Sequence, residues 1–193
     1  MSVVSQDENL AYHATRLLIL IRWCGKPRRS TADKLPGVVG RTLLAKTDFF
    51  LRYPFYLNQA ISIRKENDAK LRKDISYENL GVSSFEELVT VESQMVRYLY
   101  GPWDYVYYPV LAYMIGKGLV KIEKGTRNVE IFRLTAKGLE ITELLGREQA
   151  FQDLIVRADV VYYLFNKFTG SRLKDFIYNY FPEVVNRKIG KGI

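Results

Sequence analysis

Residues 95–145 constrain the fold of this chain more than any other segment. Two short runs rich in β-branched residues, 119–124 and 129–134, flank Gly125-Thr126-Arg127-Asn128, whose composition favours a turn between two strands. The apolar residues before and after these runs recur at helical spacing. The segment therefore predicts, in order, a helix, a turn, a helix, a β-hairpin and a final helix.

Capping residues support that order. Gly118 stands where the second helix would end in the left-handed conformation that favours glycine, and Thr135 is placed to cap the helix after the hairpin. This order is typical of a winged helix, a module that binds nucleic acid or docks within larger assemblies. We therefore expect a mainly α chain with a small β-hairpin wing (α+β), a winged helix-turn-helix with additional N-terminal and C-terminal helices.

Further helices are predicted before this hairpin. Helical spacing of apolar residues covers 9–24 and 38–51, and Pro54 is well placed to open the next helix. A capping box at 84–87 predicts a helix that resumes through Leu99.

The start of the following helix is open between two residues. Either Asp104 caps it, which leaves Pro109 inside the helix without a backbone N–H, or the helix begins at Pro109. Beyond the hairpin, apolar spacing predicts helices over 151–168 and 172–181. The resulting division is an N-terminal helical region (1–83), a winged-helix domain (84–146), C-terminal helices that pack on it (147–185) and a basic, disordered tail (186–193).

No catalytic or metal-binding motif occurs in the sequence. The single histidine, His13, and the single cysteine, Cys24, lie on one apolar helical stripe, which favours structural roles for both. We therefore expect no enzyme, no catalytic residue, no cofactor and no metal site. One cysteine also excludes an internal disulfide, and the longest apolar run is far shorter than the ~20 residues that span a bilayer. These features favour a cytoplasmic protein without membrane contact.

Basic residues gather in and around the hairpin. With 29 Lys and Arg against 21 Asp and Glu, the net charge is +8, which draws the chain to polyanions. The candidate nucleic-acid contacts are cations of the wing and of the loop at 26–37: Lys121, Lys124, Arg127, Arg133, Arg28 and Arg29. The alternative is a solvated hairpin edge. The helix at 109–117 has no Arg, Asn or Gln to read bases, so DNA contact would be independent of sequence.

Aromatic residues crowd the segment before that helix. Tyr and Trp are enriched in interface hot spots, so part of this run is expected to face a protein partner, and the alternatives are core packing and base stacking on a single strand. The candidate partner interface is Trp103, Tyr105, Tyr107 and Tyr100.

Three sequence blocks resemble a known family. Phe49-Phe50-Leu51-Arg52-Tyr53-Pro54, the block at 91–98 and Tyr100-Gly101-Pro102-Trp103-Asp104 look like the small middle components of bacterial three-component ABC-ATPase systems. These include the small subunit of Lamassu-type anti-phage and anti-plasmid defence complexes. Similar steps downstream extend the resemblance over about residues 16–185.

The resemblance implies a non-catalytic accessory subunit, an adaptor without a cofactor. It would sit on an SMC- or RecN-like ABC ATPase, as winged-helix subunits associated with kleisins do. It would then couple that ATPase to an effector such as a nuclease. The alternative is a homodimeric winged-helix DNA-binding transcriptional regulator, which the lack of base-reading residues disfavours.

Overall fold

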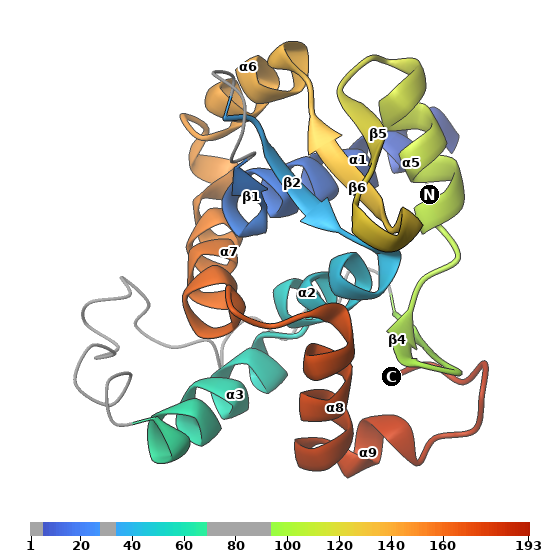
Figure 1. The fold of residues 1–193 in the computed structure, drawn as a ribbon, viewed down its shortest axis with the longest axis vertical. Helices are drawn as coiled ribbons and strands as arrows, with labels where there is room; N and C mark the ends of the chain where they lie inside the picture. The colour runs from blue at the N-terminus through green and yellow to red at the C-terminus, as the bar shows by residue number, and fades with distance from the viewer. Residues whose placement is uncertain (1–5, 28–33, 69–93) are drawn as a thin grey trace, which may run out of the picture.

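The computed structural model describes residues 6–27, 34–68 and 94–193, and side chains from Leu10 onward (Figure 1). It is mainly helical with a small antiparallel sheet, which confirms the expected α+β class. The helices are α1 (Gln6–Cys24), α2 (Arg41–Arg52), α3 (Pro54–Asn67), α5 (Tyr107–Gly116), α6 (Ala136–Leu145), α7 (Gln152–Phe165), α8 (Gly170–Tyr180) and α9 (Pro182–Val185). None of these described helices is both long and apolar enough to cross a membrane.

The sheet contains the predicted hairpin and two strands that the sequence did not reveal. Its order is β1 (Lys26–Pro27), β2 (Pro36–Val39), β6 (Glu130–Leu134) and β5 (Val120–Lys124), all antiparallel. Val38 and Val39, predicted as helical, pair instead with Phe132 and Ile131 of β6. That part of the prediction is wrong because the pairing partner, β6, lies far along the chain. The spacing of apolar residues at 38–51 contains no information about such a distant partner.

The capping prediction is confirmed. Gly118 has φ +69°, the left-handed conformation expected at a helix end. The Thr135 hydroxyl accepts a hydrogen bond from the Gly138 backbone N–H at 3.0 Å, which caps α6. A short 3-10 turn, Thr126–Asn128, joins β5 to β6.

Helix α1 lies behind the sheet and contacts α5, α6 and α7 (Figure 1). Its residues 17–21 are almost completely buried. One hydrophobic cluster joins Leu17 of α1 to Met114 of α5, Phe132 of β6 and Val161 of α7. Helices from the three regions predicted by sequence therefore share one core.

A second, smaller hairpin replaces the helix predicted through Leu99. β3 (Val96–Tyr98) pairs with β4 (Gly101–Trp103), and Gly101 adopts φ +95° just after the turn. The helical prediction is wrong here because β3 forms backbone hydrogen bonds on both sides, with β4 on one side and with the C-terminal residues on the other. The capping box at 84–87 lies outside the described residues.

The C-terminal tail forms the other partner of β3, whereas the sequence predicted disorder. The Gly190 N–H donates to the Arg97 carbonyl at 2.7 Å, and the Arg97 N–H donates to the Lys191 carbonyl at 2.8 Å. The Ile193 N–H donates to the Met95 carbonyl at 2.8 Å, and the Ile193 side chain is buried. The tail is ordered because β3 offers it an edge of backbone donors and acceptors.

Helix α5 begins at Tyr107, between the two starts left open by the sequence. The Asp104 side chain accepts a hydrogen bond from the Val106 N–H at 2.9 Å and orders the turn before the helix. Pro109 lies in the first turn, where backbone N–H groups lack a partner within the helix, so its missing N–H does not weaken α5.

Candidate functional site

A buried ionic cluster holds α1, α2 and α5 together. The fully buried carboxylate of Asp48 accepts hydrogen bonds from Arg16 Nε at 2.8 Å, Arg52 Nε at 2.9 Å and the Tyr107 hydroxyl at 2.7 Å. Arg52 also reaches Asp104 at 2.6 Å. Burial by itself would raise the pKa of Asp48, but the two guanidinium groups outweigh it and hold that pKa below its ordinary value. The carboxylate therefore stays ionised inside the core.

This cluster corrects one predicted interface residue. Tyr107 is only 2% exposed, and its hydroxyl donates to Asp48. Burial, and then the Asp48 charge, raise the pKa of Tyr107, so the hydroxyl keeps the proton that it donates. Tyr107 therefore belongs to the core and not to a surface that faces a partner.

His13 and Cys24, predicted to share one apolar stripe, pack at the hydrophobic core and both make hydrogen bonds. His13 Nδ1 lies 2.9 Å from an Arg16 nitrogen, and burial lowers the pKa of His13, which favours a neutral ring that accepts this hydrogen bond. Cys24 donates to the Ala158 carbonyl at 3.3 Å, and burial raises the pKa of the thiol. Among the residues that the structure describes, no three His, Cys, Asp or Glu side chains gather as metal ligands would.

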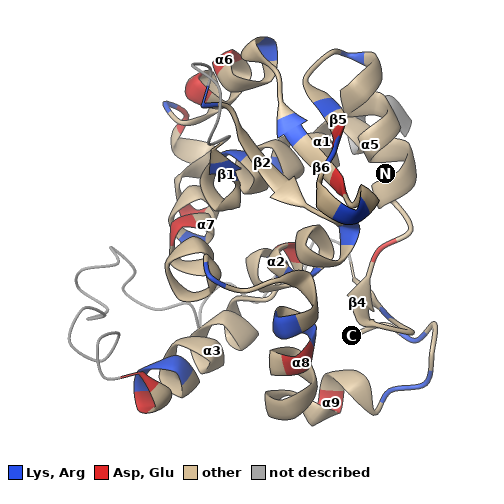
Figure 2. Ribbon diagram, in the orientation of Figure 1, with Lys and Arg blue, Asp and Glu red and all other residues tan. Residues whose placement is uncertain are grey.

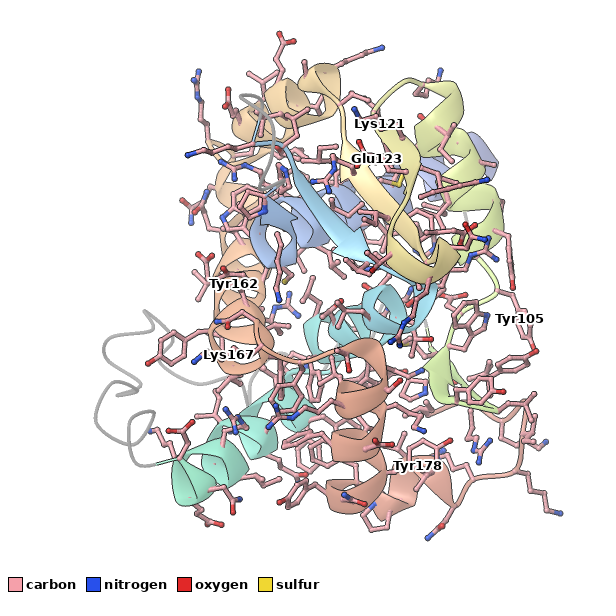
Figure 3. All side chains as sticks on the ribbon, viewed as in Figure 1. Tyr105, Lys121, Glu123, Tyr162, Lys167 and Tyr178 are labelled. Atoms are coloured by element: carbon pink, nitrogen blue, oxygen red, sulfur yellow. The ribbon has the colours of Figure 1, made fainter. Side chains whose placement is uncertain are left out.

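Basic and acidic residues both occur in the β5–β6 hairpin (Figure 2), and fewer wing cations are free of ion pairs than the composition indicated. Arg133 is buried, pairs with Glu123 at 2.7 Å and donates to the carbonyls of Leu35 and Lys26. It therefore ties β6 to both ends of the β1–β2 connection and does not face a phosphate. Lys121 pairs with Glu123 at 3.3 Å, and Figure 3 shows both side chains on β5.

Two wing cations remain candidates for nucleic-acid contact. Lys124 and Arg127 are exposed at the wing turn, and neither makes an ion pair within the described part of the chain. Arg28 and Arg29 lie outside the described residues. The wing surface is thus reduced to these two side chains, with Lys121 beside them.

Replacing Lys124 and Arg127 with Glu is expected to weaken binding to duplex DNA about tenfold near 0.1 M salt and to lower the salt slope by about 2. The reason is that each residue is expected to neutralise one phosphate. Fluorescence anisotropy with a labelled duplex over a salt series measures both quantities. A double variant with Lys167→Glu and Lys188→Glu carries the same charge change away from the wing and is the control. Equal binding by both variants would mean that the wing is a solvated edge.

Exposed and half-buried aromatic side chains, with one exposed leucine, gather at the β3–β4 hairpin and the start of α5. We call this set the aromatic surface and define it as Leu99, Tyr100, Trp103, Tyr105 and Tyr108. Tyr100 is 62% exposed and Tyr105 55% exposed, whereas Trp103 is half-buried. Tyr98 links Trp103 to Tyr105, with ring centroids about 6 Å apart in each pair. Figure 3 shows Tyr105 at the outer edge of the molecule beside β4.

The exposed face of α5 continues this surface. Tyr108, Ala112 and Ile115 lie at helical spacing and are all exposed. This face carries no Arg, Asn or Gln, which are the side chains suited to reading bases in a major groove. The arrangement is better suited to contact with an apolar partner surface than to sequence recognition.

The backbone under the aromatic surface is held at several points. Lys46 Nζ donates to the Pro102 carbonyl at 2.8 Å, and the Tyr178 hydroxyl donates to the Leu99 carbonyl at 3.0 Å. On the far side of β3, Arg97 Nε donates to the Val185 carbonyl at 3.1 Å. The exposed rings therefore stand on a fixed frame, which lowers the entropy cost of binding.

Sequence reasoning missed Lys46 and Asp48, although a signal was present. Both residues fall among apolar neighbours of the 38–51 pattern, since Lys46 lies three residues after Leu43 and Asp48 lies three before Leu51. A charged residue on the apolar face of a helix points to a buried polar contact.

No family model, curated protein or solved structure matches the chain.

Proposed function

We propose that this chain is a non-catalytic adaptor that docks through its aromatic surface on an SMC- or RecN-like ABC ATPase and couples it to an effector. The observation that carries the proposal is the exposure of Tyr100, Tyr105 and Tyr108 on a hydrogen-bonded frame. Tyrosine and tryptophan provide large contact areas and are enriched in interface hot spots. The identity of the ATPase, and a role in defence against phage and plasmids, rest on the sequence resemblance.

The winged-helix assignment is part of this proposal. A winged helix built on α1, β2, α2, α5, β5 and β6 would begin near residue 6, not at residue 84. The β3–β4 hairpin would then be inserted directly before its third helix, α5. The helix that reads DNA in other members of this class would here present the apolar face of Tyr108, Ala112 and Ile115. This placement supports docking over sequence-specific regulation.

The proposal is tested by co-expressing the tagged chain with its genomic neighbours and identifying by mass spectrometry what is recovered with it. We expect a large coiled-coil ATPase in a stable heteromeric complex. Recovery of this chain alone, with the ATPase eluting separately, would contradict the proposal. A homodimer that binds one short duplex selectively would support the regulator instead.

The docking surface has its own test. The double variant Tyr100→Ala, Tyr105→Ala is expected to weaken the complex about 30- to 1,000-fold, because hot-spot aromatics commonly contribute about 1–2 kcal/mol or more each. Both rings are more than half exposed, so the melting temperature of the isolated chain should change little. Phe55→Ala is the matched control, since Phe55 is 63% exposed on α3 and lies outside the aromatic surface. Equal affinity of wild type and double variant, measured by surface plasmon resonance, would place the interface elsewhere.

A further inference from the structure

A cavity of about 210 Å³ opens between the sheet and the C-terminal helices. Its walls come from the end of α1, from β1 and β2, from α2, and from α7 with the turn into α8. The apolar part of its lining includes Val38, Val39, Leu43, Val161, Phe165 and Phe168. A cavity of roughly 150 Å³ with such walls accommodates a benzene ring, so this pocket has room for one ring and a small substituent.

The polar side chains of the pocket fall into two groups. The Thr47 hydroxyl donates to main-chain carbonyls of α2, and the Thr169 hydroxyl accepts from the Arg172 N–H, so both are used by the fold. The side chains of Lys26, Tyr162 and Asn166 make no hydrogen bond within the described residues. Three polar groups are thus available around an apolar interior, the usual composition of a ligand pocket.

The only charge in the described lining of the pocket is positive. Lys26 is the only charged residue of the lining, which includes no carboxylate among the described residues. Lys167 follows the lining residue Asn166, just beyond the end of α7 (Figure 3). The Arg172 guanidinium lies 4.3 Å from the ring centroid of the lining residue Phe168. A ligand with a negative group would meet Lys26 and no acid of the described lining. The Asp159 carboxylate of α7 acts on Cys24 from outside the lining.

Cys24 does not supply covalent chemistry to this pocket. Its thiol donates to the Ala158 carbonyl, and burial raises its pKa, so it is a protonated part of the wall. Binding in this pocket therefore needs no reactive group on the ligand.

We propose that this pocket binds a small monoanionic ligand with one flat apolar ring, of the aromatic carboxylate class. The ring enters between Val38, Leu43 and Phe165, and the carboxylate remains at the entrance near Lys26 and Asn166. The proposal does not rest on the adaptor function, and either can fail without the other.

Ligand-observed and ¹H–¹⁵N NMR titrations of the full chain test this proposal with three probes. Benzoate carries both features, benzyl alcohol has the ring without the charge, and acetate has the charge without the ring. We expect benzoate to bind with a Kd of about 1 mM or tighter. Benzyl alcohol should bind about tenfold more weakly, and acetate should not bind. Undetectable benzoate binding, or equal binding of benzoate and benzyl alcohol, would overturn the proposal.

Two variants locate the site. Val39→Trp should abolish benzoate binding, because Val39 is 44% exposed at the pocket and a larger side chain there fills the space without entering the core. Ile122→Trp is the matched control, since Ile122 is 46% exposed on β5 and is absent from the lining. Lys26→Gln should weaken benzoate about fivefold or more and leave benzyl alcohol unchanged. Benzoate binding that survives Val39→Trp would overturn the assignment of this pocket.

Discussion

Asp48→Ala is expected to lower the free energy of unfolding by about 3–5 kcal/mol, the largest effect of any single substitution considered for this chain. The substitution removes the acceptor shared by Arg16, Arg52 and Tyr107, all of which are buried. Arg16 would be left with its guanidinium in the core and no carboxylate within the described residues. Urea unfolding followed by circular dichroism measures the loss.

The matched control for this prediction is Asp175→Ala. Asp175 also pairs with a cation, Lys174 at 3.1 Å, but its side chain is 60% exposed. Exposed pairs contribute about 0–1 kcal/mol, so this variant should unfold almost as the wild type does. If Asp48→Ala were as mild as Asp175→Ala, the buried cluster would not stabilise the contact between α1, α2 and α5.

The second large effect concerns pH. Stability of the wild type should rise as pH increases from about 7 to about 9, and Lys46→Met should lose most of that rise. Burial, and then the charge of Lys174, lower the pKa of Lys46 to about 7 in the folded chain, against an ordinary value of 10.5. Between these values the unfolded chain binds a proton that the folded chain does not, so stability increases with pH.

The expected size of this rise is about 2 kcal/mol or more, since each pKa unit corresponds to about 1.4 kcal/mol and hydration of the buried amine reduces the full effect. Urea midpoints at pH 7, 8 and 9 should therefore diverge between the wild type and Lys46→Met. Lys124→Met, at the exposed wing turn, should keep the wild-type slope. Parallel plots of stability against pH for all three proteins would mean that Lys46 takes up no proton on unfolding in this range.

Local sequence was sufficient for the hairpin at 120–134 and for most helices. In these elements the interacting residues are close in the chain. The β5–β6 turn joins adjacent strands, Thr135 caps a residue three positions away, and Pro54 fixes the start of its own helix. Spacing and capping rules describe such contacts directly. The same reasoning put His13 and Cys24 on one apolar stripe, where His13 is buried, Cys24 is half-buried and both make hydrogen bonds.

The tertiary structure alone decided which predicted site residues reach the surface. The sequence predicted Arg133 as a nucleic-acid contact of the wing, but its side chain is buried and donates to the Lys26 and Leu35 carbonyls. Tyr107 is buried, and its hydroxyl donates a hydrogen bond to Asp48, a residue distant in sequence.

The sequence by itself therefore determined most of the helices, the hairpin at 120–134, the basic charge and the aromatic composition. The tertiary structure decided the strands β2 and β3, the ordered tail and the exposure of Tyr100 and Tyr105. The physical reason is that these features depend on pairing between segments distant in sequence. Local propensity does not depend on which distant segments meet. In the folded chain, backbone hydrogen bonds and burial of apolar side chains stabilise one particular pairing.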